Sequence, residues 1–208
     1  MIYIDRSSIP KPNILKKYRH GKHRWEDVSV EDKKVLRETL RTLQHSSCAY
    51  CGVKLAPEGK MHIDHFEPRS SSPQKTFCWS NLFLCCPNDG RQYCASYKDN
   101  TKNRNKNKAI LKPDQVNPES YLTYERAEIK CREPNPDSTL ALNTIERLNL
   151  NHRDLVNQRE SLLKRVDSTI EGLNDVLLSG KISIDDLLTK FQEDFGFVHM
   201  LKHHLKGE

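Results

Sequence analysis

The sequence predicts an α+β fold, in which short strands occupy the middle of the chain and helices lie on either side of them. Apolar residues recur at helical spacing before residue 44 and again after residue 136. Between these parts, residues 48–98 combine short apolar runs with Cys, His, Pro and Gly, a pattern typical of strands and turns. The 208 residues suit one moderately large domain, or a small module with a helical extension.

The N-terminal residues 1–28 are expected to form an irregular, mostly extended arm. They contain Pro10 and Pro12 and a run rich in Lys, Arg and His from Lys16 to Arg24. The opening residues, MIYIDRSSIPKPN, do not place a basic stretch before an apolar one, so we expect no signal peptide. No stretch approaches the roughly 18 consecutive apolar residues that a membrane span requires. We therefore expect a cytoplasmic protein with no membrane partner.

Helix start signals and apolar periodicity predict four helices. The first begins at Ser29, three residues before Asp32, and runs to about Gln44. The others are a short helix after Pro136, a long helix with an apolar stripe, and a last amphipathic helix. Their marker residues are Leu140 and Leu148 in the short helix, Asn151, Asp154 and Gly180 at the ends of the long helix, and Ser183 and Leu201 at the ends of the last helix. Together with the motifs below, this predicts an N-terminal arm and helix (1–47), a strand-containing core (48–112) and a helical C-terminal region (113–208).

The net charge of +6 is concentrated in one part of the chain. From Lys98 to Lys112 there are six Lys or Arg residues and one acid, and without this stretch the chain has 28 basic and 27 acidic side chains. A local excess favours contact with a polyanion at one place, although a solvated loop that keeps the chain soluble explains it equally well. Residues 99–108 have no apolar face and are predicted to be a loop. The expected nucleic-acid-binding side chains are Lys98, Lys102, Arg104, Lys106 and Lys108.

Seven cysteines in a chain expected in a reducing compartment favour metal binding over disulfides. Cys48 and Cys51 form a Cys-x2-Cys pair, whose spacer lets both thiolates bind one zinc ion from a tight turn. Tetrahedral zinc needs four ligands, and we expect Cys86 and Cys94 to supply the other two, although seven residues separate them. Four thiolates leave no open position for water, so this zinc would be structural. The remaining cysteines are expected to be buried apolar side chains: Cys78, Cys85 and Cys131.

The segment HIDHFEPRS, residues 62–70, lies between the two cysteine pairs on a predicted strand, and a second strand is predicted after Asn81. An oxygen ligand such as Asp64 can hold Mg²⁺ or Mn²⁺, which binds a phosphate. A neutral imidazole such as His65 can take the proton from an attacking water. Asn81 could hydrogen-bond that imidazole and fix its orientation. Alternatively, His62 joins the zinc site, or the two histidines are simple surface residues. The predicted strands are residues 61–66 and 82–84.

In this order, the motifs resemble the HNH, or ββα-metal, nuclease superfamily. The shared residues are Cys48, Cys51, Asp64, His65, Pro68, Asn81, Leu82 and Cys86, followed by a later Cys and Lys. A narrower resemblance, to the PtuB-like nuclease subunits of Septu-type anti-phage defence systems and their retron-associated versions, covers roughly residues 35–160. It is based on CAYCG, HIDHFEPRS, the WSNL sequence before the second strand, and the segment NPESYLTY…NTIERLNLNHRDLVNQR within residues 117–159.

The resemblance implies a small zinc-stapled ββα-metal core with a helical N-terminal element and a mainly α-helical C-terminal extension. It implies that His65 is the general base, Asp64 a catalytic-metal ligand and Asn81 the middle Asn of the signature, and it matches Lys98 to a Lys that could touch phosphate. Such nucleases usually carry a metal-binding His or Asn directly after the last zinc cysteine, where this chain has Ala95. The side chains that could substitute for it are Asn88, Asp89, Ser96, Asp99 and Asn100.

The same resemblance implies partners. These are nucleic acid as the substrate, an ABC/SMC-like ATPase subunit (PtuA-like) that restrains the nuclease, and, in retron-associated versions, a retron reverse transcriptase–msDNA complex. The helices after Asp137 are candidates for docking the ATPase, although closing the core of the protein itself is the commoner use of an apolar stripe.

Three functions are consistent with these residues. The first is a metal-dependent endonuclease that cuts DNA, and the second cuts RNA, such as a transfer RNA, with the same site. The third is a zinc-knuckle binding or adaptor subunit without catalysis, which Ala95 supports and the presence of Asp64, His65 and Asn81 argues against.

Overall fold

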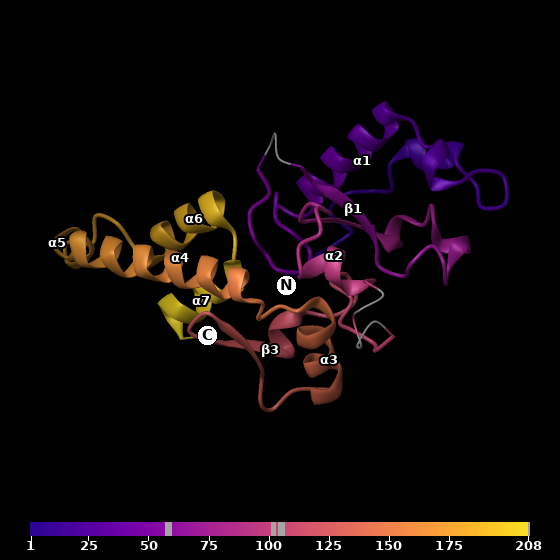
Figure 1. Ribbon diagram of the computed structural model, residues 1–208. Coiled ribbons are helices and arrows are strands. Elements are labelled where there is room, and N and C mark those ends of the chain that lie inside the picture. Colours follow the sequence, from indigo (N-terminus) through magenta and orange to yellow (C-terminus); the bar gives the residue numbers. More distant parts are fainter. Residues whose placement is uncertain (57–59, 101–102, 104–106, 208) are drawn as a thin grey trace.

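The computed structural model describes residues 1–56, 60–100, 103 and 107–207 and has a mixed α+β architecture with small antiparallel sheets (Figure 1). The α-helices in these residues are α1 (Val30–Leu43), α2 (Cys94–Lys98), α3 (Ser138–Leu148), α4 (Arg153–Gly172), α5 (Asn174–Leu178), α6 (Ile184–Phe195) and α7 (Val198–Lys206). The strands are β1 (His62–His65), β2 (Leu82–Cys85), β3 (Leu122–Glu125) and β4 (Glu128–Cys131). Short 3-10 helices cover Asn13–Lys17, Trp25–Asp27, Pro73–Lys75, Trp79–Asn81 and Pro118–Ser120.

The central sheet consists of β1 and β2, which pair antiparallel with His62 opposite Cys85 and His65 opposite Leu82. Both predicted strands are confirmed. All four residues of β2 are buried, which explains its uninterrupted apolar sequence LFLC. The short helix α2 follows β2, so that strand, strand and helix occur in the order that the ββα-metal resemblance implied. The residue pattern itself favoured only strands and turns up to residue 98.

Helix α1 begins where the sequence predicted, because the Ser29 side chain accepts a hydrogen bond from the backbone N–H of Asp32. Its C-terminal end is tied to β2 through Gln44, whose amide group donates to the carbonyl of Leu84 at 2.7 Å and accepts from its N–H at 2.8 Å. Gln44 and Leu84 are both fully buried, so these two bonds satisfy polar groups that cannot reach water. They hold the chain that leads to Cys48 against the second strand.

A second hairpin, β3–β4, was not predicted. Its turn lies at Arg126, which has a left-handed backbone (φ 51°) without the Gly or Asn that usually marks such a turn. The predicted cap of the long helix, Asn151, instead supports this hairpin: its side chain accepts from the N–H of Ile129 and donates to the carbonyl of the same residue, both at 2.8 Å. The side chain of His152 accepts from Asp154 N–H in its place at the start of α4.

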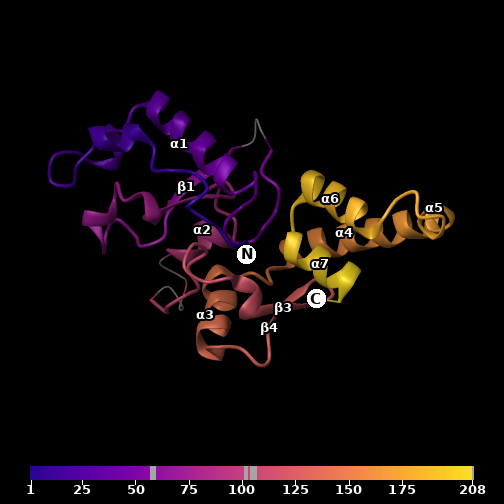
Figure 2. The ribbon, with the colours of Figure 1, turned by 180° about the vertical axis from the view of Figure 1, so that it is seen from behind.

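The C-terminal helices lie on one side of the molecule, where α4 projects from the rest with α5 at its outer end and α6 beside it (Figures 1 and 2). The long helix was predicted to run to Gly180, but α4 ends at Gly172 and α5 follows it. The last predicted helix is also interrupted, because Gly196 and Phe197 both have positive φ angles that end α6 and redirect the chain into α7.

This interruption brings the C-terminal region against the turn that carries Cys51. The N–H of Phe197 donates to the carbonyl of Gly52 at 2.7 Å, and the N–H of Lys54 donates to the carbonyl of Phe195 at 3.0 Å. Gly196 passes so close that a Cβ atom there would lie 2.3 Å from the Gly52 carbonyl oxygen. The C-terminal helices are therefore bonded directly to the cysteine-bearing turn.

A single buried apolar cluster extends from Met1 to Leu201. The first residues join it because Ile2 N–H donates to the carbonyl of Ala49 and Ile4 N–H to that of Pro113. The three-part division of the chain stays a prediction, and these contacts cross both of its boundaries. Among the described helices, none has the length and apolar character needed to cross a bilayer.

The contact at Gly196 predicts a large loss of stability for Gly196→Ala. Gly180 is the matched control, because it too has a positive φ (71°) but has open space around its Cα. We expect Gly196→Ala to lower the free energy of unfolding by about 1–3 kcal/mol more than Gly180→Ala does, measured by urea denaturation. Equal losses for the two variants would show that the C-terminal region does not press against the turn.

Candidate functional site

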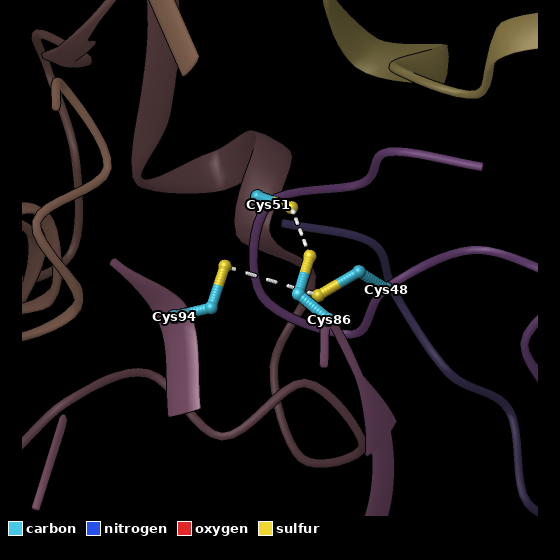
Figure 3. Close-up of side chains that lie close together, drawn as sticks. All are labelled: Cys48, Cys51, Cys86 and Cys94. Atoms are coloured by element: carbon cyan, nitrogen blue, oxygen red, sulfur yellow. Dashed lines mark hydrogen bonds between the residues drawn. The ribbon is translucent and has the colours of Figure 1, made fainter. Parts of the chain in front are cut away.

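Four buried thiols meet where the turn after α1, the end of β2 and the start of α2 converge (Figure 3). The sulfur atoms of Cys48, Cys51, Cys86 and Cys94 all lie within 4.8 Å of one another. Those of Cys48 and Cys94 are 3.9 Å apart, and those of Cys51 and Cys86 are 3.5 Å apart. A tetrahedral site with zinc–sulfur bonds of about 2.3 Å has sulfur atoms about 3.8 Å apart. The four thiols therefore fit a four-coordinate metal site.

The turn that carries the first two thiols is a tight loop closed by its own backbone. Gly52 N–H donates to the carbonyl of Cys48 at 3.0 Å, and Cys48 N–H donates to that of Val53 at 2.9 Å. Gly52 takes a left-handed conformation (φ 79°), which the absence of a side chain permits. The N–H of Ala49 donates to the carbonyl of Leu84 and joins the turn to β2.

The other three cysteines differ from the expectation that all are buried. Cys85 is fully buried, but Cys78 is exposed and Cys131 is partly buried. Cys78 directly precedes the 3-10 helix at residues 79–81, and its side chain lies on the surface loop that connects the two central strands. Its apolar neighbours in the sequence, Phe77 and Trp79, are the buried ones.

The Asp64 carboxylate is held by two buried donors. Its Oδ2 atom accepts from the Tyr50 hydroxyl at 2.5 Å and lies 3.0 Å from the Lys98 ammonium nitrogen. Burial, and after it the charge of Asp64, raises the pKa of Tyr50, so its hydroxyl keeps the proton that it donates. Within the described part of the chain, both contacts of this carboxylate use Oδ2. Its other oxygen, Oδ1, accepts no hydrogen bond from the described residues.

The position of Lys98 corrects the expectation that it contacts phosphate. Its side chain is fully buried, and its ammonium group donates to the carbonyls of His65 at 2.7 Å and Phe66 at 2.9 Å. It also lies 3.0 Å from carboxylate oxygens of Asp64 and Asp99. A buried carboxylate requires a compensating cation, and α2 places Lys98 where it supplies one. Lys98 is therefore an internal brace between α2 and the end of β1.

The imidazole of His65 is buried and has a defined tautomer. Its Nε2 atom lies 3.0 Å from the carbonyl oxygen of Thr76. A carbonyl oxygen only accepts hydrogen bonds, so Nε2 carries the proton and Nδ1 has the free lone pair. Burial lowers the pKa of His65 to about 4, against the opposing effects of the Thr76 bond and the charge of Asp64. The ring is therefore neutral at pH 7, as a general base must be.

Asn81 does not contact the imidazole, contrary to expectation. Its side-chain oxygen accepts from Glu67 N–H at 2.8 Å, and its nitrogen donates to the carbonyls of Glu67 at 3.1 Å and Lys75 at 3.2 Å. These three bonds close the loop between the two strands at both ends. One of these bonds therefore holds the loop backbone at Lys75, directly before Thr76, the partner of His65.

Asp64 and His65 open onto one cleft of about 540 Å³, which is the candidate active-site cleft. Its lining includes His62, Asp64, His65, Asn88 and Asp99, together with Trp25 and Arg69. His62 faces this cleft, while the four-thiol cluster has all its ligand positions filled by cysteine. The structure therefore gives no support to His62 as a zinc ligand.

Two of the five side chains expected to replace a ligand at Ala95 lie in this cleft. Asp99 follows Ala95 by four residues, which is one turn of α2, and burial raises the pKa of its carboxyl group. Asn88 lies in the loop before α2. Of the others, Asp89 forms an ion pair with Arg91, and Ser96 donates a hydrogen bond to the side chain of Asn88.

The predicted basic patch is only partly described by the structure. Lys102, Arg104 and Lys106 lie outside the described residues. Lys108 is exposed and forms an ion pair with Glu146 at 2.8 Å. Lys98 is excluded from the patch by its burial.

Three functional side chains were not expected. Tyr50 lies within the Cys-x2-Cys spacer. Its hydroxyl, placed between two cysteines, is a local signal for a hydrogen-bond donor near the thiol cluster. Trp25 packs edge-on against His65, with ring centroids 4.6 Å apart. Arg69 lines the cleft beside it. The sequence carries no local signal for Trp25, because the fold brings the N-terminal arm to the two strands, whereas Arg69 lies within the HIDHFEPRS segment.

Comparison with known proteins shows a similarity to a retron protein. No family model matches the chain. A candidate HNH endonuclease of the retron Vc95, from Vibrio cholerae serotype O1 biovar El Tor, is 25% identical over 193 residues. The alignment covers 85% of this chain and 85% of the relative.

Proposed function

We propose that this protein is a metal-dependent endonuclease of the HNH type that hydrolyses phosphodiester bonds of nucleic acid. The observation that carries the proposal is the juxtaposition of Asp64 and His65 in one cleft, on a strand–strand–helix unit held together by four thiols. The similarity to the retron protein supports the same chemistry.

The four thiols would bind structural zinc. The donor set is four sulfur atoms, their spacing matches tetrahedral zinc, and all four side chains are buried. Such a site joins three segments of the chain. These are the turn that carries Cys48 and Cys51, the end of β2 at Cys86 and the start of α2 at Cys94. Its role is to hold these segments together.

Asp64 would bind a catalytic Mg²⁺ or Mn²⁺ through Oδ1, while Tyr50 and Lys98 hold Oδ2. Asp99 and Asn88 line the same cleft and are the oxygen ligands that we propose in place of a residue at Ala95. When bound, the metal supplies electrostatic stabilisation of the charge that develops on the phosphate and the leaving oxygen.

His65 would act as the general base. Its Nδ1 atom accepts a proton from a water molecule in the cleft, while the bond from Nε2–H to Thr76 keeps the ring in the orientation that this requires. Asn81 holds the loop that carries Thr76. The chain itself therefore positions the base, the carboxylate and the wall of the cleft.

The biological setting is a further part of the proposal. The retron relative supports a retron context with nucleic acid as the substrate. The defence role and the choice between DNA and RNA stay predictions based on the sequence. The narrower PtuB-like assignment, the ABC/SMC-like ATPase partner and the reverse transcriptase–msDNA complex stay predictions based on the sequence resemblance. The non-catalytic adaptor is the competing function, and the first experiment below separates it from a nuclease.

The mechanism predicts that His65→Ala abolishes cleavage and leaves the fold intact. Cleavage of DNA and of RNA is measured with Mg²⁺ or Mn²⁺, with the partner ATPase present. We expect a loss of at least about 100-fold, the usual contribution of a general base. His204→Ala, on α7, is the control, because that imidazole pairs with Asp167 away from the cleft. Retained cutting by His65→Ala would remove the imidazole from the mechanism, and no cutting by the unaltered protein would favour the adaptor.

The metal assignment predicts that Cys48→Ser lowers the zinc content and the stability, whereas Cys78→Ser changes neither. Both substitutions replace one sulfur by oxygen, but Cys78 is exposed and lies outside the thiol cluster. Zinc is counted per chain by elemental analysis, and stability is measured by thermal unfolding. Undiminished zinc in Cys48→Ser would show that the four-cysteine ligand set is wrong.

A further inference from the structure

We propose that the N-terminal arm forms a groove that binds the nucleic-acid strand next to the cleavage site, with Trp25 stacking on a base and basic side chains contacting the phosphates. This groove, called here the arm groove, has a volume of about 480 Å³. Its lining includes His20, Lys22, Arg24, Trp25, Arg69 and Thr76. The inference rests on the proposed function, because it takes nucleic acid as the substrate.

The arm groove adjoins the active-site cleft. Trp25 and Arg69 line both hollows. Thr76 lines the arm groove and receives the hydrogen bond of His65. A strand whose phosphodiester lies at His65 therefore reaches the arm groove within the next nucleotides.

The arm is a folded part of the protein. Leu15 is buried in the core, and Tyr18 stacks on Phe77 with ring centroids 5.6 Å apart. The Tyr18 hydroxyl donates to Asp32 at 2.6 Å, and the Lys17 ammonium donates to the same carboxylate at 2.9 Å. These contacts fix the position of the groove relative to α1 and the cleft.

The charge of the arm suits a polyanion. From Lys16 to Arg24 the sequence has five Lys or Arg residues, two His and no acid. Lys16, Arg19 and Lys22 are exposed, and no acidic side chain in the described part of the chain forms an ion pair with any of them. The two acids that line the groove are engaged with neighbouring basic residues. These pairs are Glu26 with Arg69 at 2.7 Å, and Asp27 with the side chain of Arg24 at 3.7 Å.

Trp25 supplies an aromatic surface between the two hollows. Its side chain is only partly buried, and its ring meets that of His65 at an interplanar angle of 86°. The Lys33 ammonium lies 5.9 Å from the Trp25 ring centroid. An aromatic ring beside basic side chains is the combination by which proteins bind single strands, through stacking and phosphate contacts.

Tryptophan fluorescence tests the stacking contact without cleavage. The chain has two Trp residues, and Trp79→Phe leaves Trp25 as the sole reporter. The Trp79 ring is nearly buried and its indole N–H has no hydrogen-bond partner in the described residues, so Phe is a suitable replacement. With no divalent metal added, we expect a short single-stranded DNA, or the matching RNA, to quench Trp25. Heparin, which is a polyanion without bases, should not quench Trp25. Binding without quenching, or equal quenching by heparin, would overturn the stacking contact.

Charge variants test the phosphate contacts. We expect Lys22→Ala with Arg24→Ala to reduce the slope of log affinity against log salt by about 1–2, the effect of losing two phosphate contacts. Lys164→Ala with Lys181→Ala removes the same charge from exposed sites on and near the C-terminal helices and should leave the slope unchanged. We expect Trp25→Leu to weaken binding about tenfold and Trp25→Phe to weaken it less, because Phe still stacks.

The outcomes separate the groove from the nuclease assignment. If the protein cleaves nucleic acid but the Lys22/Arg24 variant binds like its control, the proposal that the arm groove binds the strand is wrong and the nuclease assignment remains. If oligonucleotides quench the fluorescence of Trp25 but the unaltered protein never cleaves, the nuclease assignment is wrong and strand binding at the arm groove remains.

Discussion

The Asp64 carboxylate is held by donors from both halves of the thiol cluster, and the rest of the site depends on this arrangement. Tyr50 lies between Cys48 and Cys51, and Lys98 lies one helical turn after Cys94. Any displacement of either cysteine pair therefore moves a side chain that contacts the carboxylate. The Lys98 ammonium also binds the carbonyl of His65, so the same brace fixes the backbone of the neighbouring imidazole.

This arrangement explains how a small structure holds a defined site. Strands β1 and β2 have four residues each, and an isolated hairpin of that size is at best marginally stable in water. Three sets of contacts stabilise this sheet and the turn beside it. They are the thiol cluster, the bonds of Gln44 to β2, and the backbone bonds of the C-terminal region to Gly52. The same frame leaves one side open, where the cleft meets the N-terminal arm.

Much of this site could be predicted from local sequence, because its parts are short motifs with fixed spacing. The four thiols, the strand of Asp64 and His65 and the cap at Ser29 are of this kind. The errors concern contacts between distant segments. Lys98 was expected on the surface and is buried, because only the fold shows that it faces Asp64. The β3–β4 turn at Arg126 lacks the usual turn residues, and the role of Trp25 depends on how the arm folds back.

The contacts of Tyr50 and Lys98 with the Asp64 carboxylate are tested most directly by the Mn²⁺ affinity of the Tyr50→Phe variant. This change removes one hydroxyl and no thiol. Isothermal titration of the zinc-loaded protein measures the Mn²⁺ affinity, and elemental analysis checks that the zinc content is unchanged. If Asp64 holds the proposed metal, we expect Mn²⁺ to bind about 10- to 100-fold more weakly, the usual effect of removing a hydrogen bond to a metal-binding carboxylate. Unchanged Mn²⁺ affinity with full zinc content would contradict this expectation.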